Sequence, residues 1–502
     1  MVLGMGMVIP PILSGKTNNR VSLNHVAFCI IRGQMKLPEN NDGETPDQSG
    51  APQQANVDRR ARLHPRGKLL IVALVFFTAL GVRLLNWENR HREVFAVQTS
   101  VANNYKHLAG LIRANGLASL YDASSATSNP DLLGHPPGYP ILLSLVYRVA
   151  PESDTATQVL QMILDSLAAV IICLIAFELF PAAVGVIAGL MAAFAPQFSW
   201  NSILLLPDSL AALPILLAVL LITRTRQRPG RLLPILAAGA LIGISCWLRA
   251  NALLLAPFMA LLFPFIYKRG ERLRPALMLL CGACLIIGPL TIRNAVVFGK
   301  FIPVSLGAGQ TLIEGIADYN TDGTLGLPQT DMELIRGEAE TFQRPDYAGS
   351  LFTPDGPARD RARMARGVAV IRAHPVWFFG VMIRRATAML RLERTPLRLP
   401  TADSNNAARL LQWPLRLIQN LFITAIFLPL VLLGVGILIY QRQFQRLAIL
   451  LAVPLYYFCT QSALHTEYRY VLVIHYFLFT LAAVSVYTIG RTIKQGVSPK
   501  TA

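Results

Sequence analysis

Three arginine residues lie next to long apolar stretches of the chain. Arg249 lies in the sequence WLRAN, Arg293 directly follows GPLTI, and Arg469 lies in HTEYRY. A guanidinium group binds phosphate through paired hydrogen bonds, although an arginine at the end of an apolar helix can also anchor that helix at lipid headgroups. Because all three have polar or aromatic neighbours, we favour a site for the phosphate of an anionic lipid. The neighbours expected to line this site are Asn294, Glu467 and Tyr470.

A proline-rich motif, HPPGYP, occupies residues 135–140. Three prolines and a glycine predict a rigid, extended turn, because proline fixes its own φ and restricts the residue before it. A short apolar stretch follows, so we expect the turn to hold His135 and Tyr139 at the boundary between lipid and water. A plain turn at the start of a helix is the alternative.

Acidic residues near these groups are candidates for a general base, which must reach the group that it deprotonates. Glu88 and Glu93 directly follow the first long apolar stretch and are the best-placed catalytic candidates, although either could be a solvated loop charge. Asp208 lies near the start of a later apolar stretch, where it can support the same site. Asp165 falls inside an apolar stretch, where an ionisable group faces a cavity or a partner on a neighbouring helix.

The elements that must position these residues are apolar helices. Hydrophobic residues make up 53% of the 502 residues and charged residues only 15%, whereas soluble domains have about a quarter charged residues. About ten stretches of roughly 17 to 25 residues are long enough to cross a bilayer as helices. These stretches are Leu69–Leu85, Thr155–Leu179, Ala182–Phe198, Leu204–Thr223, Leu232–Leu248, Ala250–Tyr267, Ala276–Ile292, Leu417–Tyr440, Leu447–Leu464 and Val471–Ile489.

The distribution of Lys and Arg predicts the orientation of these helices. The chain has 46 Lys and Arg against 28 Asp and Glu, a net charge of +18. The basic residues cluster in short loops between apolar stretches, which is typical of cytoplasmic loops and does not indicate a nucleic-acid-binding surface. Counting through about ten crossings places these loops and both termini on one side. We therefore predict a multi-pass protein of the cytoplasmic membrane with both termini in the cytoplasm and no nucleic-acid partner.

The resulting fold class is an all-α polytopic membrane protein with two long outer segments. Short helices lying on the membrane are expected at residues 103–115, 141–149 and 368–392. The predicted parts are a disordered cytoplasmic tail (1–67), a membrane domain (68–292) with a first outer loop (86–154), an outer segment with interfacial helices (293–416), C-terminal transmembrane helices (417–490) and a cytoplasmic tail (491–502).

Several common catalytic motifs are absent from the sequence. It has no G-x-x-x-x-G-K-[ST] phosphate loop, no H-E-x-x-H and no G-x-S-x-G. If the protein transfers a sugar, a donor carried on a membrane lipid is therefore favoured over a nucleotide sugar. No cluster of ligands requires a metal, although a divalent metal ion could bridge a phosphate and carboxylates.

The order of these motifs resembles that of the GT-C glycosyltransferases, close to family 39, which includes protein mannosyltransferases and aminoarabinose transferases. The similar features are a long outer loop after the first helix, then HPPGYP, then GPLTIRN followed by FGK, and finally EYRY before the last apolar stretch. The GPLTIRN stretch is similar to one that recurs in bacterial members, which points to a bacterial protein. The resemblance covers the chain from Leu69 to Ile489.

The resemblance implies a bundle of many transmembrane helices, which here would number about ten. It also implies transfer of a sugar from a polyprenyl-phosphate donor to an acceptor at the outer face, with inversion at the anomeric carbon. The three arginines would hold the phosphate, and Glu88 or Glu93 would act on the acceptor. Many relatives place an Asp where this chain has Asn103 and Asn104, and amides cannot act as bases. The sugar is not identified, and the acceptor could be a glycan, a lipid or a protein.

Two other functions are compatible with the same composition. A transporter or flippase of lipid-linked sugars would need polar groups across the membrane and often has internal repeats, and we find no repeat. A non-catalytic membrane scaffold is the third interpretation, because the acid expected in relatives is replaced by Asn103 and Asn104.

Overall fold

The computed structural model describes residues 64–94, 96–97, 99–122, 131–226, 228, 230–393, 395–398 and 406–497. All regular elements in these ranges are helices, as predicted. The described residues from 64 to 488 belong to one compact unit. The predicted disordered tail lies outside the described residues except for residues 64–67, and the first described helix already begins at residue 65.

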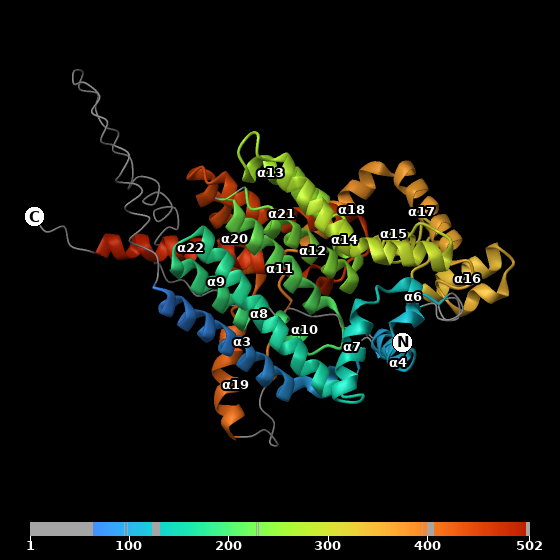
Figure 1. Cartoon of the computed structure of the whole chain (residues 1–502), viewed down its shortest axis with the longest axis horizontal. Coiled ribbons are helices and arrows are strands. Elements are labelled where there is room, and N and C mark those ends of the chain that lie inside the picture. Colours follow the sequence, from blue (N-terminus) through green and yellow to red (C-terminus); the bar gives the residue numbers. More distant parts are fainter. Residues whose placement is uncertain are drawn as a thin grey trace, which may run out of the picture. The chain divides into compact units, whose positions relative to one another are not determined.

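Helices occupy all the predicted apolar stretches, but they differ in length (Figure 1). Five segments are long and apolar enough to cross a membrane: α3 (Pro65–Val94), α8 (Asp154–Leu179), α11 (Asp208–Thr225), α14 (Leu273–Phe298) and residues Tyr468–Gln495, which comprise η5 (Tyr468–Val471) and most of α22 (Leu472–Val497). A sixth span results if α19 (Asn406–Gln419) and α20 (Thr424–Tyr440), which bend by 57°, count together.

The remaining predicted spans are shorter helices. These are α9 (Ala182–Phe194), α12 (Leu233–Leu248), η2 with α13 (Ala250–Ala252 and Leu255–Ile266) and α21 (Phe444–Thr460). By length and composition, five helices, or six with the bent pair, are long enough to cross a membrane within the described residues, and the other predicted spans are present as helices of 12 to 17 residues. Proline explains one break: α9 ends before Pro196, which begins the short helix α10 (Pro196–Asn201), because a helix rarely continues into the residue before a proline.

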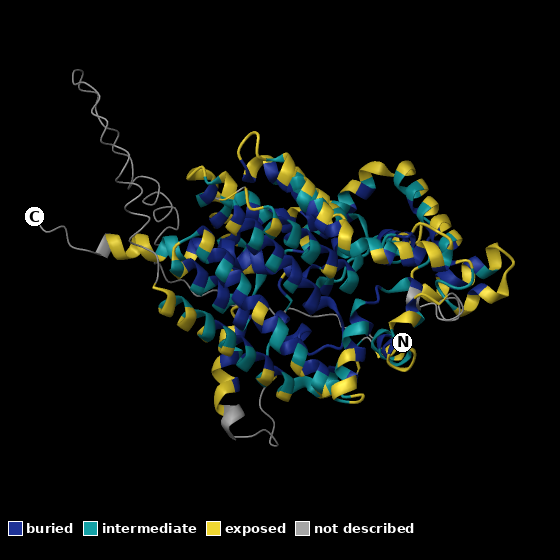
Figure 2. Cartoon of the chain, viewed as in Figure 1, coloured by how far each residue is buried: buried dark blue, intermediate teal, exposed yellow. Residues whose placement is uncertain are grey.

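Small residues let the central helices approach closely. Helices α11, α12 and α14 pack in sequence order, and their facing sides are buried (Figure 2). A Cβ atom added at Gly239 of α12 would lie 2.0 Å from the carbonyl oxygen of Leu279, and one added at Gly282 of α14 would lie 2.0 Å from that of Leu236. The two helices thus cross backbone to backbone, as small residues allow in membrane bundles.

Replacing Gly239 with leucine should separate α12 from α14. We expect Gly239→Leu to lower the free energy of unfolding by about 3 kcal/mol, because the carbonyl oxygen of Leu279 belongs to rigid backbone and cannot move aside. The thermal unfolding midpoint in detergent measures the effect. Gly436→Leu is the matched control, since a Cβ at this exposed position meets nothing within 4 Å. Equal midpoints for the two variants would contradict the predicted close crossing.

Two groups of shorter helices connect the long ones. The first comprises α4 (Thr99–Asn115), η1 (Leu117–Leu120), α6 (Asp131–Gly134) and α7 (Gly138–Val149), so the helices expected at 103–115 and 141–149 are present. The second comprises α15 (Ala308–Ala317), α16 (Asp331–Thr341), η3 (Pro345–Gly349), α17 (Gly356–Ala373) and α18 (Pro375–Ala388). The single helix expected at 368–392 is therefore two helices, which meet at His374 and Pro375.

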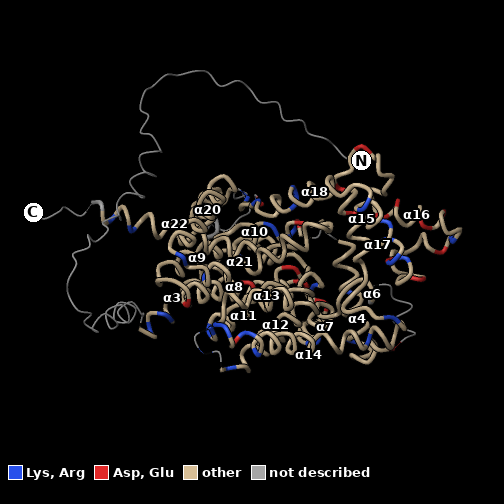
Figure 3. Tube along the Cα trace, turned by 90° about the horizontal axis from the view of Figure 1, so that it is seen from above, with Lys and Arg blue, Asp and Glu red and all other residues tan. Residues whose placement is uncertain are grey.

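Charges distinguish these connecting helices from the long ones. Both acidic and basic residues occur along α16 and α17, whereas α11 carries charged residues only at its two ends (Figure 3). Glu338 on α16 lies between Arg359 and Arg363 of α17, with oxygen–nitrogen distances of 2.8 and 2.6 Å.

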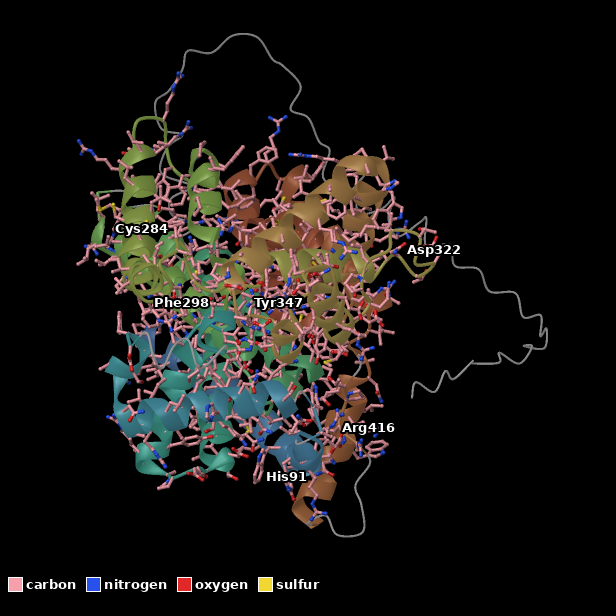
Figure 4. All side chains as sticks on the ribbon, turned by 90° about the vertical axis from the view of Figure 1, so that its right-hand side faces the viewer. His91, Cys284, Phe298, Asp322, Tyr347 and Arg416 are labelled. Atoms are coloured by element: carbon pink, nitrogen blue, oxygen red, sulfur yellow. The ribbon has the colours of Figure 1, made fainter. Side chains whose placement is uncertain are left out.

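At another end of the unit, α19 packs against α3 and the side chain of Arg416 donates to the carbonyl oxygen of Leu397 (Figure 4).

Candidate active site

Two of the predicted arginines converge on one aspartate. Asp208 is the first residue of α11, where a carboxylate is favoured by the exposed N–H groups of a helix N-terminus. Arg249 follows α12 in an extended conformation (φ −148°, ψ 127°), which ends that helix and turns the side chain toward Asp208. Its Nε donates to Asp208 Oδ1 at 2.7 Å. The side chain of Asp208 is only 2% exposed, so this ion pair is shielded from water.

Arg469 approaches Asp208 from η5. Its Nη1 lies 4.0 Å from Asp208 Oδ2, and its Nη2 donates to Glu467 Oε1 at 2.8 Å. The ring of Tyr470 lies beside both guanidinium groups, 4.3 Å from that of Arg249 and 5.0 Å from that of Arg469, which are cation–π distances. Among the residues that the structure describes, Arg469 Nη1 and Asp208 Oδ2 are buried without a hydrogen-bond partner.

A partly open recess reaches this charged group. It is lined by polar residues Asp208, Arg249, Asn251 and Tyr470 and by apolar side chains of α11 and α22. We call Asp208, Arg249, Glu467, Arg469 and Tyr470 the arginine site. These residues come from three separate parts of the chain, and the unpartnered Nη1 of Arg469 could donate a hydrogen bond to an anionic oxygen that enters the recess.

The HPPGYP motif packs beside the arginine site. A Cβ added at Gly138 would lie 2.4 Å from the carbonyl oxygen of Trp247, so only glycine lets α7 approach the end of α12 so closely. The rings of His135 and Tyr139 each lie 5.1 Å from the ring of Tyr105 on α4. The Tyr139 hydroxyl donates to Gln161 of α8 at 2.8 Å.

The predicted extended turn is shorter than expected. Helix α7 begins at Gly138, so Tyr139 and Pro140 already belong to its first turn. Proline is tolerated there, because the first N–H groups of a helix have no acceptor within it. The prediction of an extended conformation across all six residues is therefore wrong for residues 138–140.

His135 should make the protein sensitive to acid. Burial, together with the positive charge of Arg249, lowers the pKa of His135 to about 4, against about 6.5 in an unfolded chain. Between about pH 6.5 and about pH 4, His135 binds a proton in the unfolded state but not in the folded state. This difference lowers the free energy of unfolding by roughly 2 kcal/mol at about pH 5.

The variant His135→Gln cannot take up this proton in either state. We expect the thermal unfolding midpoint to fall less between pH 7.5 and pH 5 in this variant than in the wild type. His64→Gln serves as the control, because His64 is exposed. Identical pH dependence of the wild type and His135→Gln would contradict the prediction.

The predicted catalytic acids do not follow the first helix as expected. Helix α3 continues to Val94, so Glu88 and Glu93 lie on its last two turns. Glu88 is exposed, and Glu93 pairs with Arg90 at 3.1 Å and with Arg398 at 2.9 Å. The loop position assigned to them was wrong, because the polar sequence after residue 85 still favours helix.

Arg293 and Asn294 have other partners than those expected. Arg293, on α14, donates to the carbonyl oxygen of Leu120 at 2.8 Å and to Asn294 Oδ1 at 2.7 Å. The Asn294 amide donates to the carbonyl oxygens of Ile302 and Val304. These contacts join α14 to η1 and to residues 302–304, which follow α14. Arg293 and Asn294 therefore hold these segments together, a structural role that the sequence did not indicate.

Other polar residues near the arginine site were not predicted. Tyr105 is buried, and its ring joins His135 to Tyr139. Glu393, in the segment after α18, lies near the side chain of Tyr468, the residue before Arg469. The sequence contains no signal for Tyr105 or Glu393 beyond their residue types, because their contacts join segments that lie far apart in the chain. Across the described ranges, no group of three or more His, Cys, Asp or Glu could hold a metal ion.

Comparison with known proteins supports the predicted resemblance. The family model described as dolichyl-phosphate-mannose-protein mannosyltransferase matches residues 134–291, which include His135, Asp208 and Arg249. No curated protein is significantly similar to the chain in sequence.

Several solved structures match the chain at low sequence identity. The oligosaccharyltransferase of Archaeoglobus fulgidus, tethered to an acceptor peptide containing the NVT sequon, matches with a TM-score of 0.51 and 14% identity over 86% of this chain and 50% of that chain. AglB of Archaeoglobus fulgidus, in complex with an inhibitory peptide and a dolichol-phosphate, matches with a TM-score of 0.49 and 16% identity over 87% and 52%. ArnT of Cupriavidus metallidurans, bound to undecaprenyl phosphate, matches with a TM-score of 0.30 and 15% identity over 86% and 80%.

The chain spans about half the length of the archaeal proteins that it matches. The family model and the match to the oligosaccharyltransferase together confirm the predicted all-α membrane fold of the GT-C type.

Proposed function

We propose that this protein is an integral membrane glycosyltransferase that moves a sugar from a polyprenyl-phosphate donor to an acceptor at the outer face of the bacterial cytoplasmic membrane. The convergence of Arg249 and Arg469 on Asp208, which lines a recess together with Arg249 and apolar side chains of α11 and α22, carries this proposal. A lipid phosphate needs cationic donors, and its tail needs an apolar surface nearby. The family model that covers Arg249 describes transferases that use dolichyl-phosphate mannose.

The geometry of the arginine site suits the departure of a lipid phosphate. Arg249 is held in place by Asp208, and Arg469 by Glu467, so neither guanidinium has to reorganise when the donor enters. As the bond between the sugar and the phosphate breaks, negative charge grows on the phosphate oxygens. Preorganised donors in a site with little water stabilise such charge strongly. Arg469 Nη1 makes no hydrogen bond among the described residues and lies 4.0 Å from Asp208 Oδ2, so it keeps the capacity to donate to a phosphate oxygen.

The transporter interpretation requires polar groups that line a path across the membrane. Asp165, the acid expected deep in a helix, accepts a hydrogen bond from Arg83 at 2.6 Å and one from Tyr476 at 3.1 Å. A carboxylate held by two partners in the bundle core is suited to holding helices together. The scaffold interpretation does not explain why Arg249 and Asp208 line a recess while Arg469 is held against the same aspartate.

A transfer assay tests the proposal. Membranes containing the protein would receive undecaprenyl-phosphate mannose, glucose and arabinose, each with a labelled sugar, and membranes without the protein would serve as the control. We expect labelled acceptor and free undecaprenyl phosphate to form with one of these donors. Label that enters sealed vesicles while it remains on its lipid would instead support transport, and no consumption of any donor would overturn the proposal.

A further inference from the structure

A second group of buried polar atoms lies beside the arginine site. Gln197 and Asn201, on α10, are only 1% and 2% exposed. Gln197 Nε2, a donor, and Asn201 Oδ1, an acceptor, have no hydrogen-bond partner within the described part of the chain. Buried polar groups are rarely left unpaired, because each costs about 1 to 3 kcal/mol. Two such atoms on one short helix therefore point to a polar ligand.

The carboxyl group of Glu393 joins this group. Its backbone N–H donates to Gln197 Oε1 at 3.3 Å, which places the segment after α18 against α10. Its carboxyl group lies near the side chain of Tyr468, whose hydroxyl accepts a hydrogen bond from Asn201 Nδ2 at 3.3 Å. The second carboxyl oxygen, Oε2, is buried and unpartnered among the described residues. We call Gln197, Asn201, Glu393 and Tyr468 the glutamate site.

The glutamate site adjoins the arginine site through one stretch of backbone. Tyr468 belongs to the glutamate site, and the next residue, Arg469, belongs to the arginine site. Burial raises the pKa of Glu393, and the nearby negative charge of Glu467 raises it further, whereas Arg90 opposes this shift. A carboxylate with a raised pKa is a stronger base at neutral pH than an ordinary glutamate.

The other acids of this region are already engaged. Glu93 pairs with Arg90 and Arg398, Asp208 pairs with Arg249, and Glu467 pairs with Arg469. Glu393 is positioned by the hydrogen bond from its backbone N–H to Gln197, and its carboxyl oxygen Oε2 is buried without a hydrogen-bond partner among the described residues. This combination is what a positioned base requires.

We propose that Glu393 is the general base of the transfer reaction and that Gln197 and Asn201 bind hydroxyl groups of the acceptor. A hydroxyl group both donates and accepts, so neighbouring hydroxyls of a glycan or another polyol would satisfy the unpaired donor of Gln197 and the unpaired acceptors of Asn201 and Glu393. This assignment rests on the proposed function and adds to it the class of acceptor.

The acceptor oxygen attacks the anomeric carbon and forms the new glycosidic bond, while Glu393 Oε2 takes the proton of the attacking hydroxyl. The bond between the anomeric carbon and the phosphate oxygen breaks, and its electron pair leaves with the lipid phosphate at the arginine site. No oxidant, reductant or further reactant is needed.

The variant Glu393→Gln tests this assignment, because it keeps the size of the side chain and removes the base. We expect it to slow release of undecaprenyl phosphate from the donor that the wild type uses by about 10²–10⁴-fold. Binding of undecaprenyl phosphate itself should stay within twofold of the wild type, and Glu393→Asp should restore part of the rate. Glu340→Gln is the matched control, since Glu340 is exposed on α16.

Several outcomes would overturn the assignment. A wild-type rate in Glu393→Gln would exclude Glu393 as the base while leaving the proposed function intact. An equal loss of undecaprenyl phosphate binding would show a structural role instead. A product joined through nitrogen would exclude the hydroxyl acceptor. A wild type that consumes no donor would overturn the proposed function and this assignment together.

Discussion

Replacement of Arg249 by alanine is expected to lower the rate of sugar transfer by about 10²–10³-fold. The guanidinium group would no longer stabilise the departing lipid phosphate, and loss of one preorganised donor from an oxyanion site has about this effect. Arg249→Lys should recover only part of the rate, because an ammonium group keeps the charge but cannot make the paired contact with phosphate and Asp208. Release of undecaprenyl phosphate from labelled donor measures both rates.

Arg249→Ala can lose activity either because the phosphate is no longer stabilised or because the protein folds less stably. Arg249→Ala leaves Asp208 buried without its closest cation, which is itself destabilising. The double variant Arg249→Ala with Asp208→Ala removes both charges, so it should unfold at a higher temperature than Arg249→Ala and remain inactive. Arg224→Ala is the matched control, since Arg224 forms an exposed pair with Glu178. Recovery of activity in the double variant would contradict a direct role for Arg249.

The second large effect is expected at the buried pair of Arg83 and Asp165. Asp165→Ala should lower the free energy of unfolding by about 3 to 5 kcal/mol, because it leaves Arg83, which is 0% exposed, without its counter-ion. The pair joins α3 to α8, and Tyr476 connects it to α22 by donating to Asp165 at 3.1 Å. Loss of Asp165 therefore weakens the contacts of three helices, and the thermal unfolding midpoint in detergent measures this loss.

A charge-free replacement gives the matching test. In the double variant Arg83→Met with Asp165→Leu, neither side chain is left as an uncompensated buried charge, so stability should return most of the way to that of the wild type. Sugar transfer should return with it, since neither residue belongs to the arginine site. A stable double variant without activity would show that the pair serves function as well as folding.

Much of the architecture could be predicted from the sequence because it depends on local properties. Apolar length predicted the positions of the helices, and proline and glycine predicted a turn at HPPGYP. The grouping of Arg249 and Arg469 with Asp208 could be expected because all three lie at ends of apolar stretches. The same reasoning placed Arg293 there as well, although its observed contacts are with Leu120 and Asn294.

Which further acid lies near the arginine site, besides Asp208 and Glu467, was decided by tertiary structure alone. Glu88 and Glu93 were chosen because they lie close to the first apolar stretch in sequence, but α3 continues through both. Glu393 reaches the same region because the segment after α18 packs against α10, nearly 200 residues earlier in the chain. The physical reason is that helix formation depends on neighbours within a few residues, whereas a polar site depends on which distant helix ends meet when the bundle packs.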